Sequence, residues 1–186
     1  MSSAAYGITP DTKSWTWVLE RPCPECGLDT RDVAPEDVAA LLRGVTASWQ
    51  DIVSGGVDVA GEVTARPDAA TWSPLEYGCH VRDVFRVFDG RLQLMLSEVE
   101  PLFPNWDQDK TAVEDRYAEQ DPETVAAELA EAGAVIADHF AAVDGEQWAR
   151  TGVRDDGSRF TVTTFARYFV HDVIHHLYDV TGVRAA

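Results

Sequence analysis

Two histidines near the end of the chain, His171 and His175, have the spacing of a metal-ligand pair. Because they are four residues apart, a helix places both imidazoles on one face, where they can converge on one point. Imidazole is costly to bury without a partner, and the surrounding sequence YFVHDVIHHLYDV is typical of a buried helix. His176 lies about 100° further round the helix, toward Phe165 and Phe169, so we exclude it as a ligand.

A third histidine, His80, lies at the edge of the apolar face of another predicted helix. One imidazole on a facing helix would complete a three-histidine set. Such a set suits zinc, nickel, iron or copper and leaves coordination positions open. An open position distinguishes a working metal site from a structural one. His139 is expected to be an exposed or capping histidine instead.

Cys23 and Cys26 form a C-x-x-C pair in the segment RPCPECGLD. This spacing occurs in zinc knuckles and in redox pairs. The sequence has no second C-x-x-C to complete a zinc site and no βαβ pattern to indicate a thioredoxin-like motif. The segment could fold back and bring both cysteines, with Cys79, near the metal. Free thiols in a docked loop, a metal role and a redox role all stay open.

Four stretches with apolar residues at helical spacing must position these side chains. Proline at first helical turns, Ser, Thr or Asp caps, and glycine stops mark their ends. The predicted bounds are Pro35 to 54, Pro74 (after Ser73) to just before Pro101, Asp121-Pro122 to Asp144-Gly145, and a cap at Thr161 or Thr163 to Gly182. Four helices without an internal repeat predict an all-α four-helix bundle.

Two segments fall outside this helical pattern. Residues 1–34 are rich in proline and lack a helical period, which predicts an irregular N-terminal extension before a bundle domain at 35–186. Residues 101–120 are too long for a bundle turn, so we expect a long loop between the second and third helices that covers one end of the bundle. Trp106 and Tyr117 in this loop are available to shape a pocket.

Composition limits the function. The 186 residues are 45% hydrophobic, enough for one core. Asp and Glu number 32 against 15 Lys and Arg, a formal charge of −17, so nucleic acid and anionic membranes are unsuitable partners. The sequence lacks an early targeting pattern and a run of about 20 apolar residues. We expect a cytoplasmic protein with a small-molecule substrate, and the apolar last helix is compatible with a homodimer.

The segments WSPLEYGCHVRDV and FVHDVIH resemble the DinB-like superfamily, which includes mycothiol-dependent maleylpyruvate isomerases and thiol S-transferases. The resemblance covers about residues 35–182. It implies a four-helix bundle in which one histidine of the second helix and an HxxxH pair of the last helix bind a divalent metal, most often zinc or nickel. Transferred to this sequence, the ligands are His80, His171 and His175. The extension with the C-x-x-C pair departs from the commonest members.

Carboxylates near the histidines are candidates to orient them. Glu76 lies one turn before His80 and Asp83 nearly one turn after it. A carboxylate that accepts the second imidazole proton fixes the tautomer and raises the basicity of the ligand. Asp172 and Asp179 flank the pair in the last helix, where we expect ordinary surface charge.

Five residues are predicted around the open metal position. Asp83, Tyr168 and Tyr178 are candidates for groups near the reacting atoms, because they share or adjoin the histidine faces. Arg116 of the long loop is a candidate contact for an acidic cofactor. Arg82 is an alternative for the same role.

The leading hypothesis is a metal-dependent thiol S-transferase or isomerase, or a hydrolase. The metal would hold a low-molecular-weight thiol such as mycothiol, or a water, because a bound cation lowers the pKa of either ligand. A non-catalytic metal-binding or stress-response protein is the alternative. In a third interpretation the metal site is degenerate and the bundle is a dimerising scaffold.

Overall fold

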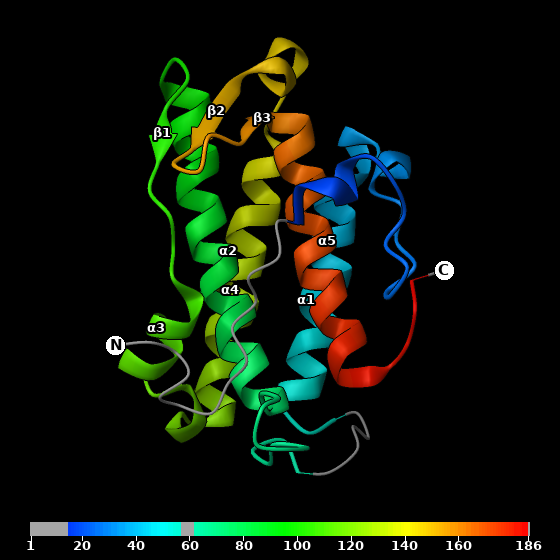
Figure 1. Ribbon diagram of the computed structural model, residues 1–186, viewed down its shortest axis with the longest axis vertical. Coiled ribbons are helices and arrows are strands. Elements are labelled where there is room, and N and C mark those ends of the chain that lie inside the picture. The colour runs from blue at the N-terminus through cyan, green and yellow to red at the C-terminus, as the bar shows by residue number, and fades with distance from the viewer. Residues whose placement is uncertain (1–14, 57–61, 186) are drawn as a thin grey trace.

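Four long helices form the body of the computed structural model, which describes residues 15–56 and 62–185 (Figure 1). They are α1 (Val38–Val53), α2 (Pro74–Ser97), α4 (Pro122–Ala141) and α5 (Val162–Thr181). The predicted all-α four-helix bundle is therefore confirmed, with bounds that differ by a few residues from those expected. The first part of the predicted extension, residues 1–14, lies outside the described residues.

The ends of α2 and α5 follow the capping residues in the sequence. The Ser73 hydroxyl accepts a hydrogen bond from the Glu76 backbone, and the Glu76 carboxylate accepts one from the Ser73 N–H, which forms a capping box. Thr161 caps α5 with the same motif, and Gly182 ends it in the left-handed conformation at φ 69°. Because both helices begin at fixed residues, the directions of their histidines are fixed too.

The predicted long loop contains short elements of its own. They are β1 (Leu102–Phe103), α3 (Gln108–Glu114) and a 3-10 turn (Tyr117–Glu119). α3 buries one residue, Ala112, so it leaves no apolar stripe in the sequence. β1 pairs in parallel with β2 (Thr151–Arg154), which pairs antiparallel with β3 (Arg159–Thr161). This small sheet covers the end of the bundle at which α5 begins (Figure 1).

Aromatic rings from α2, α4 and α5 fill the core. Phe88 stacks on Phe165 and Phe169 with centroids 4.9 and 4.8 Å away. α4 approaches α1 closely at Gly133, where an added Cβ would overlap the Thr46 side chain. Among the described helices, none is long and apolar enough to cross a membrane.

The described part of the N-terminal extension packs along α5 (Figure 1). Its 3-10 turns at Trp15–Leu19 and Thr30–Asp32 both contact this helix. From α5, the Arg167 guanidinium donates hydrogen bonds to the backbone carbonyls of Val33 and Arg31, at 3.0 and 3.1 Å. This packing holds the C-x-x-C pair beside the last helix.

Candidate functional site

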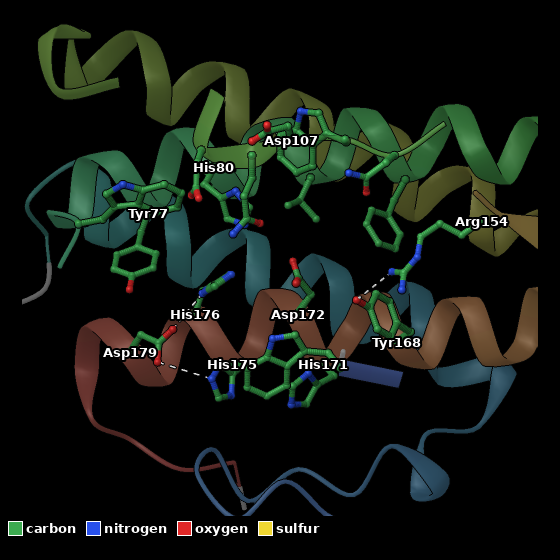
Figure 2. Close-up of a pocket in the computed structure, with 18 of the residues that line it drawn as sticks. Tyr77, His80, Asp107, Arg154, Tyr168, His171, Asp172, His175, His176 and Asp179 are labelled. Carbon is green, nitrogen blue, oxygen red and sulfur yellow. Dashed lines mark hydrogen bonds and ion pairs between the residues drawn. The ribbon is translucent and has the colours of Figure 1, made fainter. Parts of the chain in front are cut away.

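A cavity of about 540 Å³ lies between α2 and α5 (Figure 2). This volume suits a small molecule rather than a single water. Four of the chain's five histidines contribute to its wall, with tryptophans, acids and two arginines. The polar and aromatic lining includes Trp15, Glu25, Trp72, Tyr77, His80, Arg91, Trp106, Asp107, Arg154, Tyr168, His171, Asp172, His175, His176 and Asp179.

His80, Asp172 and His176 form one group of potential metal ligands, here called the pocket triad. One ligand atom from each lies within 4.8 Å of the other two. The two imidazoles meet edge to face with centroids 4.8 Å apart. In Figure 2, Asp172 and His176 point from α5 toward His80 on α2. The helix pair therefore brings two nitrogens and one carboxylate together at the cavity.

The His80 ring is buried without a conventional polar partner. Its side chain is 1% exposed, and neither ring nitrogen has a hydrogen-bond partner among the described residues. An unsatisfied buried imidazole is costly, so this ring is suited to a bound cation.

Neighbouring side chains hold the two rings of the triad in place. Trp106 stacks on His80 with centroids 5.4 Å apart and planes 5° apart, while Trp72 packs at 5.3 Å. His176 Nδ1 lies 2.9 Å from Asp179 Oδ2. A carboxylate on one nitrogen fixes the imidazole tautomer and leaves the other nitrogen for a ligand. Asp179, expected to be ordinary surface charge, is exposed and pairs with His176 across one turn of α5.

Cys23, Cys26, His171 and His175 form a second group, here called the Cys/His tetrad. One ligand atom from each lies within 4.8 Å of the others. The side chains are 1, 0, 3 and 6% exposed, in chain order. The His171 and His175 rings stack with centroids 5.1 Å apart, and Cys23 Sγ lies 3.7 Å from His175 Nδ1. In Figure 2 both histidines lie on the side of α5 away from His80.

The structure thus divides the three histidines predicted to share one ion between two groups. His171 and His175 lie with the cysteines of the extension, whereas His80 lies with His176 and Asp172. The expected direction of His176, away from the other histidines, is wrong, because its ring contacts His80. His176 and Asp172 are thus potential ligands beside His80. The signal was available, since Asp172 and His176 have the same four-residue spacing as the first pair.

Burial favours the neutral imidazole in both groups. It lowers the pKa of His80 well below the ordinary 6.5, and the nearby charge of His176 lowers it further. Burial, with a smaller contribution from His175, lowers the pKa of His171 to about 3. The pKa of His175 is also lowered, chiefly by burial. Neutral imidazole is the form that binds metal ions, so these surroundings suit ligation.

Cys79 lies in different surroundings from the pair formed by Cys23 and Cys26. Cys79 is buried on α2, where its thiol lies 3.9 Å from the Tyr117 carbonyl, and it does not belong to the tetrad. Burial raises the pKa of the Cys26 thiol to about 11, and neighbouring Cys23 adds to this. A raised pKa disfavours the redox interpretation, because redox-active cysteines have depressed values.

The other predicted site residues are distributed unevenly around the cavity. Tyr168 lines it, and its hydroxyl lies 3.4 Å from Arg154 Nη1. Tyr178 packs near His175, with centroids 6.1 Å apart, but lies outside the cavity lining. Arg116 is exposed on the surface, pairs with a nearby glutamate and also lies outside the lining.

Asp83 and Arg82 belong to a buried ion network instead of the cavity wall. The carboxylate accepts hydrogen bonds from Arg82 at 2.9 and 3.2 Å and from the Tyr117 hydroxyl at 2.6 Å. Arg82 also donates to Glu128 of α4 at 2.9 Å. This network joins α2 to α4 and to the long loop, so its residues support the fold rather than face the cavity.

Tyr117→Phe should lower the free energy of unfolding by about 1.5–3 kcal/mol, the range for hydrogen bonds to charged groups. The hydroxyl is lost while the buried ring keeps its packing. Urea unfolding followed by circular dichroism measures the change. If stability stayed the same and a metal-dependent activity disappeared, Asp83 would belong to the reaction site after all.

Arg154 lies at the end of the cavity farthest from the triad along α5 (Figure 2), and Arg91 lines the cavity near it. Arg91 lies over the Phe88 and Phe103 rings, 5.5 Å from each centroid. Burial lowers its pKa, and the nearby charge of Arg154 adds to this effect. Arg154 pairs with Asp156 at 2.5 Å. Two guanidinium groups at one end of a cavity are suited to an anionic ligand group.

Comparisons with known proteins agree with this architecture. A family model of the DinB superfamily matches residues 57–180. Among solved structures, the fold is similar to YfiT from Bacillus subtilis, described as a probable metal-dependent hydrolase with an unusual four-helix bundle topology. The TM-score is 0.69 at 17% identity, over 78% of this chain and 83% of that one. At this identity the likeness shows the fold. No curated protein matches the chain.

Proposed function

This chain belongs to the DinB superfamily, and on that basis we propose that it is a metal-dependent hydrolase of a small anionic molecule. One observation supports the proposal most directly. The pocket triad places two imidazoles and a carboxylate at the wall of a cavity of about 540 Å³, and the His80 nitrogens there have no protein partner among the described residues.

The donor set fits an open metal site. Two imidazoles and one carboxylate occupy part of the coordination shell of zinc or nickel and leave room for a further molecule. A divalent cation held by this set supplies Lewis acidity and lowers the pKa of a bound water or thiol. Compared with the expected three-histidine set, the carboxylate of Asp172 takes the place of one imidazole.

The residues around the triad orient the ligands and the substrate. Asp179 holds the tautomer of His176, and Trp106 and Trp72 fix the His80 ring from different sides. The ligands are thus preorganised before substrate arrives.

Substrate orientation would come from the basic end of the cavity. Arg91 and Arg154 can bind an anionic group through charge-assisted hydrogen bonds. Tyr168, between this end and the triad along α5, supplies a hydroxyl beside Arg154. A molecule bound in this way would carry its anionic group at one end and its reacting bond near the triad.

A thiol S-transferase or isomerase is the second candidate. The size of the cavity favours it, because about 540 Å³ can hold a thiol cofactor such as mycothiol together with part of an electrophile. In this case the thiol takes the place of water as the nucleophile at the triad. The two candidates differ in the nucleophile, which is water in a hydrolase and a thiol in a transferase or isomerase. One set of assays separates them.

The test is a kinetic comparison with purified, untagged protein of known metal content. Hydrolysis of anionic esters and amides, and addition of thiols to electrophiles, are measured with and without added zinc or nickel. Arg91→Ala should raise KM for an anionic substrate about 10-fold or more and change KM little for a neutral analogue, because one charge-assisted contact is lost.

The matched control is Arg43→Ala. Arg43 is an exposed arginine of α1 that pairs with Asp138 and lies outside the cavity lining, so its loss should leave the kinetics unchanged. A protein that binds metal at the triad but catalyses neither reaction class would favour the non-catalytic metal-binding alternative. Equal KM effects of Arg91→Ala on charged and neutral substrates would remove the anionic substrate from the proposal.

A further inference from the structure

The Cys/His tetrad joins two segments that are far apart in sequence. Cys23 and His175 are 152 positions apart, yet their Sγ and Nδ1 atoms lie 3.7 Å from each other. Zinc binds sulfur at about 2.3 Å and imidazole nitrogen at about 2.05 Å, which places the two donors about 3.6 Å apart across a tetrahedral angle. The observed separation agrees with two ligands of one ion.

The C-x-x-C segment has a turn that points both thiols to the same side. The Gly27 N–H donates to the Cys23 carbonyl, and the Cys23 N–H donates to the Leu28 carbonyl, both at 2.9 Å. Gly27 has φ 85°, a left-handed conformation that glycine adopts without strain. The turn is therefore closed by its own backbone, independently of the bundle, and presents Cys23 and Cys26 together to α5.

Contacts around the two histidines match the outer shell of a zinc site. Glu25 Oε2 lies 3.3 Å from His175 Nε2, so the carboxylate faces the ring nitrogen opposite the one near Cys23. A carboxylate on the second nitrogen is the usual support of a metal-bound histidine. His171 Nε2 is buried and has no hydrogen-bond partner among the described residues.

The tetrad would be closed by its own four donors, although His171 and His175 also lie in the wall of the cavity. Its four residues are nearly fully buried, and Trp15 covers the two imidazoles with ring centroids 5.6 and 4.8 Å away. Two thiols and two imidazoles complete a tetrahedral shell and leave no position for substrate. This donor set is typical of structural zinc, in contrast to the pocket triad.

The end of the chain also contacts this turn. The Ala185 N–H donates to the Cys26 carbonyl at 2.7 Å, and Arg184 Nη1 donates to the Pro24 carbonyl at 3.0 Å. The extension, α5 and the residues after α5 therefore meet at the tetrad. A single ion there would fasten the extension to the bundle.

We propose that Cys23, Cys26, His171 and His175 bind one Zn²⁺ ion in a closed structural site that fastens the N-terminal extension to α5. The site is separate from the pocket triad and does not depend on the proposed reaction. It also means that the HxxxH pair, which the resemblance assigns to an open metal site, serves a structural ion in this chain.

The test uses Co²⁺ as the probe on the full chain, after its metal has been removed. Thiolate ligands give Co²⁺ an intense charge-transfer absorption, which the pocket triad cannot produce because it has no thiolate. Wild type should show this absorption at one equivalent of Co²⁺, and one equivalent of Zn²⁺ should remove it. Cys23→Ser and Cys26→Ser should each weaken it strongly, and the double variant should abolish it.

Two control variants make the result specific. Cys79→Ser removes the buried cysteine outside the tetrad and should keep the absorption. His80→Ala should also keep it, while the protein loses one equivalent of bound metal. Absence of the absorption in folded wild type, or its persistence in the Cys23→Ser and Cys26→Ser double variant, would overturn the proposal.

A second measurement covers variants that fail to fold. Modification of the thiols of zinc-loaded wild type with a mercurial should release one equivalent of zinc in step with the loss of two thiols. Release of no zinc in this titration would contradict the site without any substitution. If the tetrad binds zinc and the protein is inactive, only the proposed function fails.

Discussion

Replacing His176 with alanine should reduce metal-dependent turnover about 100-fold or more, while the thiolate-to-Co²⁺ absorption of the tetrad stays unchanged. The ring contacts His80 across the cavity and belongs to the triad. Loss of a residue that only supports a metal ligand typically costs 10–100-fold in activity or affinity, so the loss of a ligand should reach or exceed the top of that range. Initial rates at saturating metal, with the metal content of each variant, measure the effect.

The comparison with His171→Ala is decisive. The resemblance makes His171 a ligand of the open metal site, whereas in the structure His176 contacts His80 and His171 lies with the cysteines. His171→Ala should weaken binding of the structural ion and its absorption, and keep metal at the triad. Asp179→Asn should reduce turnover less than His176→Ala does, since the Asp179 carboxylate orients the His176 ring. His139→Ala, which removes a histidine outside the cavity lining, is the control that should keep full activity. A folded, inactive His171→Ala beside a fully active His176→Ala would restore the three-histidine set.

Removal of zinc from the tetrad should lower the free energy of unfolding by about 4 kcal/mol, relative to protein kept at a free zinc concentration about 1,000 times Kd. The ion binds the folded chain, in which the extension and α5 supply two ligands each. For a chain of this size, the change corresponds to a fall in Tm of roughly 8–16 °C. Thermal unfolding with and without a strong chelator measures it, and limited trypsin digestion should show faster cleavage after Arg31 in the chelated protein.

Variants separate the two metal groups in this experiment as well. His80→Ala should keep the share of the chelator effect on Tm that comes from the tetrad, because the triad is already disabled. The Cys23→Ser and Cys26→Ser double variant should lose the share of the chelator effect that comes from the tetrad and keep only the share that comes from the triad. An unchanged Tm after verified metal removal from wild type would contradict a fastening role.

Most of the bundle could be predicted because its signals are local. Ser73 with Pro74, and Thr161 with Gly182, fix the ends of the helices that carry the ligands. α3 could not be predicted in the same way, since its single buried residue gives no apolar period. Its position depends on neighbours that a local pattern does not contain.

The site was predicted less completely, because helical phase alone does not say which face meets α2. Residues 171 and 175 form one pair at four-residue spacing and residues 172 and 176 form another, about 100° away. The cysteines of the extension dock beside residues 171 and 175, whereas residues 172 and 176 face His80, and these contacts decide between the two pairs. The place of Arg91 in the cavity wall was weakly indicated by its sequence position, since it lies eleven residues after His80 and thus on a similar helix face. The place of Arg154 was not indicated, because it reaches the cavity from β2.

Asp83 shows how sequence proximity can mislead. It lies three residues after His80, which suggested a shared site, but its carboxylate is bound by Arg82 and Tyr117 in a network with α4. The sequence indication that Asp83 belongs to an ion network was Arg82, a residue of opposite charge directly before it. The pairing partner on α4 could be identified only from the packed structure.

The two ligand pairs on α5, residues 171 and 175 and residues 172 and 176, alternate within about one and a half helical turns. Neither pair can therefore move along or around the helix axis without moving the other. An ion in the tetrad would restrain the rotation of α5 about its own axis, and the same restraint reduces the entropy lost when the triad becomes ordered. Occupancy of the two groups should therefore be thermodynamically linked with positive cooperativity, and by reciprocity each ion should tighten the binding of the other.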